Sequence, residues 1–333
     1  MSVVYKKLED VCEILDSRRV PITAKDRKAG TYPYYGANGL QDYVADYIFD
    51  DELVLLAEDG GNFGSKERPI AYRVSGKCWV NNHAHVLKAK PNMHVDYLCY
   101  ALMFYDTEGL VNGATRQKLT QAAMRQMVIP YRDMTEQLQI IKKISQIVRS
   151  IEKRKEELQL LDQLVKSRFI ELFGDPIKNT QHRPTTAFVN VVTMQRGFDL
   201  PVQDRKQSGN IPVYGSNGVL DHHNQAKVCN GGVITGRSGT IGKVFYTTGA
   251  YWPLNTTLFS VDTHENNIIY LAHLVRMFNL DRFTEGTGVP TLNRNKFHSA
   301  PIIDVPIDEQ NQFAAFVEQT DKSKLCGKME VAA

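Results

Sequence analysis

Residues 135–172 read TEQLQIIKKISQIVRSIEKRKEELQLLDQLVKSRFIEL, a stretch with no glycine and no proline. Apolar residues recur in it at steps of mostly four and three, with Lys, Arg and Glu between them, which is the a/d pattern of a coiled-coil seam. It predicts one long helix, about 57 Å in length at ~1.5 Å per residue, capped by Thr135 and ended by Gly174-Asp175-Pro176. The predicted packing residues are Ile140, Ile144, Ile147, Ile151, Leu158, Leu161, Val165 and Leu172.

The segments before and after this helix repeat each other in five blocks that occur in the same order. A tandem duplication explains such ordered matches far better than chance does. The matched blocks are Asp26-Arg27-Lys28 with Asp204-Arg205-Lys206, Tyr32–Gly39 with Ile211–Gly218, Leu53–Gly60 with Gly232–Gly239, Trp79–Asn82 with Trp252–Asn255, and Gly113–Gln137 with Gly286–Gln310.

Each copy is predicted to mix strands and helices. The pairs Asn38-Gly39 and Asn217-Gly218 are typical of two-residue hairpin turns, because both residue types tolerate a positive φ. Short apolar strands are expected at Leu53–Ala57 and Gly232–Thr235, and helices at Val95–Tyr105 and Asn267–Phe278.

The fold class that follows is α+β, with two homologous mixed α/β domains joined by the long helix. A second, antiparallel coiled-coil helix is expected at the C-terminus, where it looks truncated because Asp308–Ala333 leaves 26 residues against about 38 in the first, and Gly327 interrupts it further. That leaves part of the first seam, Leu158–Leu172, to contact another copy or a partner protein. The predicted boundaries are 1–133, 134–173, 174–306 and 307–333.

The composition is that of an ordinary globular protein, and the overall charge does not by itself indicate a nucleic-acid partner. Of 333 residues, 42% are hydrophobic and 23% are charged, and the net charge is +3, so a DNA-binding surface would need basic residues gathered locally. The five cysteines are widely separated, which argues against a disulfide framework or a structural zinc site and fits a reducing cytoplasm. No apolar window is long enough to span a membrane. We therefore expect a cytoplasmic protein.

The chain runs from one globular copy through a long helix to a second copy and a second helix. This order, together with several motifs, resembles one known family. The motifs are Tyr35–Gly39, Tyr214–Gly218, Thr235–Val244, Gln117–Thr120 and Met127–Pro130, the last leading into Glu136-Gln137. Over roughly residues 5–320 the chain resembles the specificity subunit of Type I restriction–modification enzymes.

That resemblance implies a DNA-binding function. Each copy would be a target recognition domain that reads one half of a bipartite site in double-stranded DNA, and the helices would set the gap. The subunit would be non-catalytic and bind no cofactor. Two methyltransferase subunits, which use S-adenosylmethionine to methylate adenine, would dock on it, and a restriction subunit would join them. The alternative is a truncated or orphan scaffold that binds methyltransferases without productive DNA recognition.

The sequence contains segments that resemble catalytic motifs, but none of them has the required residues. The segment Gly236–Val244 resembles a phosphate-binding loop, but its spacing is wrong and Val244 stands where a metal-binding Ser or Thr is needed. No methyltransferase signature is present. His83-Ala84-His85 and His222-His223 lack a further His or Cys to complete a metal site, so we interpret them as surface or DNA-facing histidines.

Candidate DNA contacts are the polar and basic residues of the matched loops. Arg, Lys, Asn and Gln read base edges, and Lys, Arg and loop amides bind phosphates. The segment Arg237–Thr240, which follows a predicted strand of the second copy, is expected to expose its amides together with a guanidinium. The alternative is that the glycines only form turns and the charges solvate the surface. The candidates are Asn62, Lys66, Arg68, Asn82, His83, Arg116, Gln117 and Lys118 in the first copy, and Arg237, Ser238, Thr240, Lys243, Asn255, Thr256 and Arg294 in the second.

Overall fold

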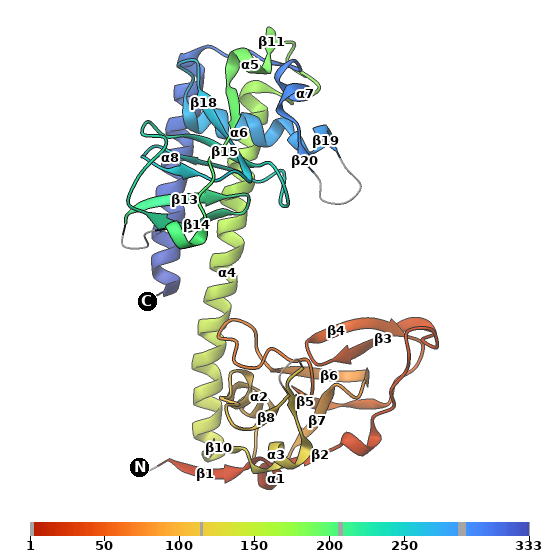
Figure 1. The fold of residues 1–333 in the computed structure, drawn as a ribbon. Coiled ribbons are helices and arrows are strands. Elements are labelled where there is room, and N and C mark those ends of the chain that lie inside the picture. Colours follow the sequence, from red (N-terminus) through yellow and green to blue (C-terminus); the bar gives the residue numbers. More distant parts are fainter. Residues whose placement is uncertain (1–2, 114–115, 206–208, 286–290, 333) are drawn as a thin grey trace. The chain divides into compact units, whose positions relative to one another are not determined.

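A computed structural model of the chain describes residues 3–113, 116–205, 209–285 and 291–332, with the backbone alone at 326–332. The chain divides into two compact units, Met1–Ser150 and Ile151–Ala333, and each contains one copy of the repeat (Figure 1). The long helix α4, Met134–Phe173, contributes its first part to one unit and its second part to the other.

The first unit is built on a six-stranded sheet of order β2-β7-β5-β6-β3-β4. One face of the central strands packs on helix α2, where Val54 and Leu56 meet Leu98 and Leu102 in a buried core. Its elements are β1 (Val4–Lys7), α1 (Leu8–Val11), β2 (Cys12–Ile14), η1 (Asp16–Arg18), β3 (Ala29–Gly36), β4 (Gly39–Val44), β5 (Phe49–Ala57), β6 (Ala71–Val80), β7 (Ala84–Ala89), α2 (Val95–Met103), β8 (Val111–Asn112), β9 (Lys118–Leu119), α3 (Gln121–Gln126) and β10 (Val128–Tyr131).

The second unit carries a four-stranded sheet, β12-β18-β15-β16, and a three-stranded sheet, β14-β13-β17. Its elements are β11 (Thr185–Ala187), α5 (Phe188–Val191), β12 (Thr193–Arg196), η2 (Val202–Asp204), β13 (Ile211–Gly215), β14 (Gly218–His223), β15 (Gly232–Gly236), β16 (Val244–Thr247), β17 (Trp252–Pro253), β18 (Thr257–Asp262), α6 (Ile268–Phe278), η3 (Leu280–Phe283), β19 (Thr284–Glu285), β20 (Thr291–Leu292), α7 (Arg294–His298), β21 (Pro301–Ile303) and α8 (Ile307–Ala332).

The strand orders show that the two units are copies of one fold. Strand β6 is continuous and pairs with both β5 and β3, which joins the first unit's strands into one sheet. In the second unit the strand equivalent to β6 is divided into β16 and β17. Strand β16 pairs with β15, and β17 pairs with β13, so the strands form two separate sheets. The duplication predicted from the sequence is therefore confirmed.

Local predictions for each copy also hold. Asn38-Gly39 joins β3 to β4 and Asn217-Gly218 joins β13 to β14, with φ of +108° at Gly39 and +111° at Gly218. The predicted strands lie within β5 and β15. The predicted helices correspond to α2 and α6.

A buried glutamine anchors the start of each long helix in the same way. The Gln137 side-chain oxygen accepts the N–H of His94, the N-cap of α2, at 2.8 Å, and its Nε2 donates to the Asn92 and Arg132 carbonyls. The equivalent Gln310 accepts the N–H of Asn267, the N-cap of α6, at 2.9 Å. The matched Glu-Gln pairs of the sequence thus fix each long helix to its own unit.

Helix α8 runs antiparallel to the second part of α4. Phe313 packs on Phe169 and Phe173, and further along α8 the Lys324 Nζ lies 2.8 Å from the Asp162 carboxylate. The prediction that Leu158–Leu172 lacks an internal partner is wrong from Val165 onward, because this part of α4 is buried against α8 and α6.

Two predicted helix details are also wrong. Helix α4 begins one residue before Thr135, and the Asp133 carboxylate accepts the N–H of Glu136 at 2.8 Å, so Asp133 caps the helix. Helix α8 is continuous through Gly327, because a single glycine costs a helix only about 1 kcal/mol. Gly174, at φ +75°, ends α4 as expected.

Candidate DNA interface

Three of the first copy's candidates gather around two neighbouring carboxylates, Asp59 and Glu58, beyond the end of β5. The Asp59 side chain lies 2.6 Å from His83 Nδ1 and 2.7 Å from Arg116 Nη2. Next to it, Lys118 Nζ lies 3.0 Å from Glu58. Arg116 and Lys118 remain about half exposed, with 61% and 49% of their side chains accessible. This end of the sheet therefore presents basic groups that partner carboxylates hold in place.

The remaining first-copy candidates lie in nearby loops. Asn62 begins a loop in which the Ser65 hydroxyl accepts the N–H groups of Glu67 and Arg68, and Lys66 and Arg68 are exposed there. Asn82 is exposed beside His83, and the Gln117 carbonyl accepts the N–H of Gly60 at 3.2 Å. The turn residue Asn38 also donates to Gly60.

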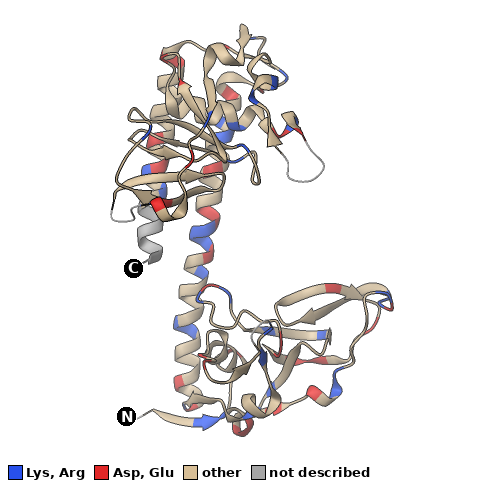
Figure 2. Cartoon of the chain, in the orientation of Figure 1, with Lys and Arg blue, Asp and Glu red and all other residues tan. Residues whose placement is uncertain are grey.

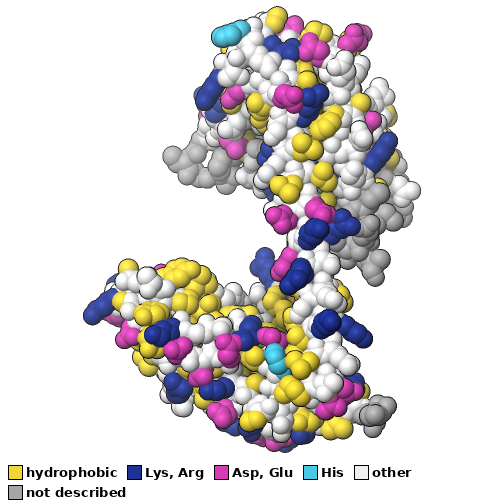
Figure 3. Space-filling model, turned by 180° about the vertical axis from the view of Figure 1, so that it is seen from behind, with side chains coloured by type: hydrophobic (Ala, Val, Ile, Leu, Met, Phe, Trp, Pro, Cys, Tyr) yellow, Lys and Arg dark blue, Asp and Glu magenta, His cyan; other side chains and the backbone are white. Residues whose placement is uncertain are grey.

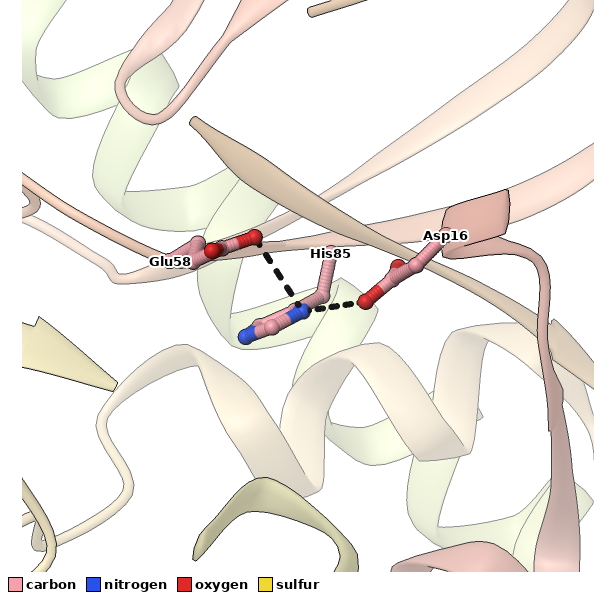
Figure 4. A group of neighbouring side chains, drawn as sticks. All are labelled: Asp16, Glu58 and His85. Atoms are coloured by element: carbon pink, nitrogen blue, oxygen red, sulfur yellow. Dashed lines mark hydrogen bonds and ion pairs between the residues drawn. The ribbon is translucent and has the colours of Figure 1, made fainter. Parts of the chain in front are cut away.

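Beneath these loops, Asp16, Glu58 and His85 form a buried cluster (Figure 4). His85 is fully buried; its Nδ1 lies 2.6 Å from Asp16 Oδ2, and its Nε2 lies 2.9 Å from the Leu119 carbonyl. Because a carbonyl only accepts hydrogen bonds, Nε2 carries a proton. The interpretation of His85 as a surface or DNA-facing histidine is therefore wrong.

The cluster is held by charge pairing among its own side chains. Burial opposes ionisation of Asp16, but the hydrogen bond and charge of His85 and the N–H of Val86 hold the pKa of Asp16 below its ordinary value. Burial likewise opposes ionisation of Glu58, while hydrogen bonds from Arg19 and Lys118 lower its pKa. These donors occupy the oxygens that a metal ion would need, so the geometry favours a structural network.

In the second copy, Arg237 and Arg294 line one pocket of about 350 Å³ together with Arg196. Arg196 was missed by sequence reasoning, because only the pairing of β12 with β18 brings it there. The pocket also contains Glu285, whose carboxylate is paired with Lys296. The structure thus places three guanidinium groups around one hollow.

The other second-copy candidates are engaged with neighbouring groups. Lys243 Nζ donates to the turn residue Asn217 at 2.6 Å, and Asn255 donates to Asp199. The expectation that the loop after β15 exposes its amides is wrong for Arg237 and Ser238, whose N–H groups donate to the Thr256 carbonyl. Thr240 is half-buried in the same loop.

In the second histidine pair, as in the first, one side chain is accessible and the other is buried. His222 is exposed on β14, but His223 is buried and its ring packs edge-on against Trp252 at 5.3 Å. The surface interpretation therefore fails for His223 as well as for His85. In β14 the period of two explains this division, because consecutive residues point to opposite faces of a strand, whereas His83 and His85 differ because only His85 lies within β7.

Charged groups of both signs are interspersed over each unit. Figure 2 shows Lys and Arg alternating with Asp and Glu along α4, and on the face seen in Figure 3 neither sign forms a continuous area. Within the described residues, no helix has the length and apolar character needed to cross a membrane. On the face seen in Figure 3, the basic groups available for DNA contact are therefore local rather than one continuous surface.

Comparison with known proteins assigns this architecture to a class of DNA-recognition proteins. The family model of the Type I restriction modification DNA specificity domain matches residues 2–161 and 190–327, which is one match for each copy. The chain therefore belongs to this family, and with it to the DNA-recognising specificity subunits of Type I restriction–modification systems.

Individual relatives agree with the family assignment. A type I restriction enzyme specificity subunit of Haemophilus influenzae is 26% identical over 95% of this chain and 87% of its own length. A type I specificity subunit of Mycoplasma pneumoniae is 20% identical over 96% of this chain and 89% of its own. The crystal structure of a Type I system S subunit from M. genitalium shares the fold, with a TM-score of 0.63 at 13% identity, over 100% of this chain and 92% of that one.

Proposed function

We propose that the chain reads a bipartite site in double-stranded DNA, with one half-site for each unit. The observation that carries this proposal is that the two units share one fold and one set of loop positions but differ in the side chains at those positions. Glu58 and Arg237 occupy the same place after equivalent strands, as do Lys118 and Thr291. Different side chains on a common scaffold suit two different base sequences.

The chain acts in the cytoplasm as the non-catalytic part of a larger complex. Methyltransferase subunits, two in number, supply adenine methylation with S-adenosylmethionine, and a restriction subunit joins through them. Support for a docking surface comes from apolar residues on α4 that remain exposed, including Ile147 at 59%, Leu160 at 55% and Leu164 at 48%. The same residues support self-association of α4 as a further prediction.

Methylation profiling of cellular DNA tests this function. Cells that express the chain together with its methyltransferase are expected to carry a methylated bipartite adenine motif, which is missing from cells that express either protein alone. Co-purification of the two proteins without any new motif would favour the scaffold alternative. Failure of the chain to bind any methyltransferase subunit would contradict the proposed docking.

A further inference from the structure

The arginine pocket of the second unit lies where the first unit has its buried acidic cluster. Backbone hydrogen bonds establish the first equivalence. The N–H of Glu58 donates to the His83 carbonyl, and its own carbonyl accepts the N–H of Leu119 at 2.7 Å. Arg237 makes the corresponding pair of bonds, and the N–H of Leu292 reaches its carbonyl at 2.8 Å. Arg237 therefore takes the place of Glu58.

Strand register gives the next two equivalences. His85 pairs with Leu56 in the first unit, and Leu258 pairs with the equivalent Thr235 in the second. The pairing of β2 with β7, continued beyond Ile14, brings Asp16 opposite His85. On β12 the residue opposite Leu258 is Arg196. Leu258 and Arg196 therefore stand where the first unit has His85 and Asp16.

Helix caps give the last equivalence, because Gln121 and Arg294 each directly follow the N-cap of a short helix. In the first unit the four positions form one cluster of hydrogen bonds and ion pairs, and in the second unit all four line the pocket. The cluster residues Asp16, Glu58, His85 and Gln121 correspond to Arg196, Arg237, Leu258 and Arg294.

The two sites differ in whether side chains of the same unit neutralise their charges. In the first unit, Arg19 and Lys118 lie at 2.6 and 3.0 Å from Glu58, so the carboxylates have internal cations. In the second unit, the one ion-pair partner of Arg196 among the described residues is the exposed Asp199, at 3.7 Å. For the Arg237 guanidinium, the described part of the chain shows no hydrogen bond or ion pair. Positive charge therefore exceeds negative charge around an open hollow.

We propose that this pocket is a phosphate-binding subsite of the second unit and that it has no counterpart in the first. Guanidinium groups bind phosphate oxygens in pairs of parallel hydrogen bonds, and several of them around one hollow suit a tetrahedral anion. The inference rests on the proposed DNA-reading function and deepens it. A backbone phosphate held there would fix the position of the second unit on its half-site without carrying base information.

The first experimental arm measures binding of inorganic phosphate to the full chain by isothermal titration calorimetry. Arg237→Gln and Arg294→Gln are each expected to weaken phosphate binding about tenfold, since each removes a charge-assisted hydrogen bond. Lys178→Gln is the matched control, because it removes one exposed positive charge of the same unit outside the pocket. Circular dichroism and thermal melting of all variants confirm that the fold is intact.

The second arm measures the affinity of the full chain for its target duplex between 50 and 200 mM salt. Because the Arg237→Gln variant neutralises one phosphate fewer, its fall in affinity across this range is expected to be about threefold smaller than that of the wild type. Weakened binding in both arms assigns a DNA backbone phosphate, and weakened binding in the first arm alone assigns a free phosphate.

Two results would overturn the phosphate subsite, and a third would separate it from the proposed DNA-reading function. Unchanged behaviour of the pocket variants in both arms overturns the phosphate subsite. An effect confined to duplexes with guanine at one position means that the arginine reads a base, which also overturns it. If the wild type binds phosphate through Arg237 but binds no duplex, the subsite stands and the DNA-reading function fails.

Discussion

Replacement of His85 by alanine is expected to lower the free energy of unfolding of the first unit by about 3–5 kcal/mol, the typical cost of removing one partner from a buried ion pair. The change leaves the Asp16 carboxylate buried without the donor that lies 2.6 Å away, and it leaves the Leu119 carbonyl without its N–H donor. Differential scanning calorimetry should show the transition of the first unit about 10 °C lower.

His83→Ala is the matched control for this variant, because His83 lies just before β7, two residues from His85, and also faces a carboxylate, Asp59. Its side chain is 35% exposed, so its removal should cost under about 1 kcal/mol. Equal effects of the two substitutions would contradict the structural role of the cluster. Stabilisation of the wild-type chain by an added divalent cation, absent in His85→Ala, would instead identify a metal site.

Gln310→Ala is expected to destabilise the second unit by about 2–3 kcal/mol, because it leaves buried backbone groups without partners. Gln310 is 1% exposed, and its amide serves the N–H of Asn267 and the Val305 carbonyl together. Urea denaturation monitored by circular dichroism gives the change in midpoint.

The neighbouring Gln312 is exposed on the same turn of α8, so Gln312→Ala is the control and should change stability by less than about 0.5 kcal/mol. Gln137→Ala should reproduce the larger effect in the first unit, since Gln137 makes the equivalent bonds to the N–H of His94 and the Arg132 carbonyl. A Gln310→Ala chain as stable as the Gln312→Ala chain would show that the glutamine does not anchor α8.

The parts of the fold that were predictable from sequence are those with a local signal. The seam of α4 gives a helix because its period is sustained over many residues. The Asn-Gly pairs give hairpins because each glycine accepts the positive φ at the turn, +108° at Gly39 and +111° at Gly218. The ordered blocks reveal the duplication. Nothing local, however, distinguishes a continuous β6 from the divided β16 and β17.

The candidate site was harder to predict because its members are distant in sequence. Asp16 meets His85 across 69 positions and Gln121 across 105, and only the sheet brings them together. His85 has no further His or Cys nearby in the sequence, and its partners are the distant carboxylates of Asp16 and Glu58. Arg196 could be found only by placing β12 against β18, where it lies opposite Leu258.

If each unit reads its own half of the DNA site, exchange of one unit should change one half-site and leave the other as it was. Residues 174–306 are replaced by the corresponding segment of a relative with a different target, and the methylated motif is determined from genomic DNA. The account predicts a hybrid motif in which one half-site changes and the other is retained. A motif in which both halves change, or in which neither does, would contradict it.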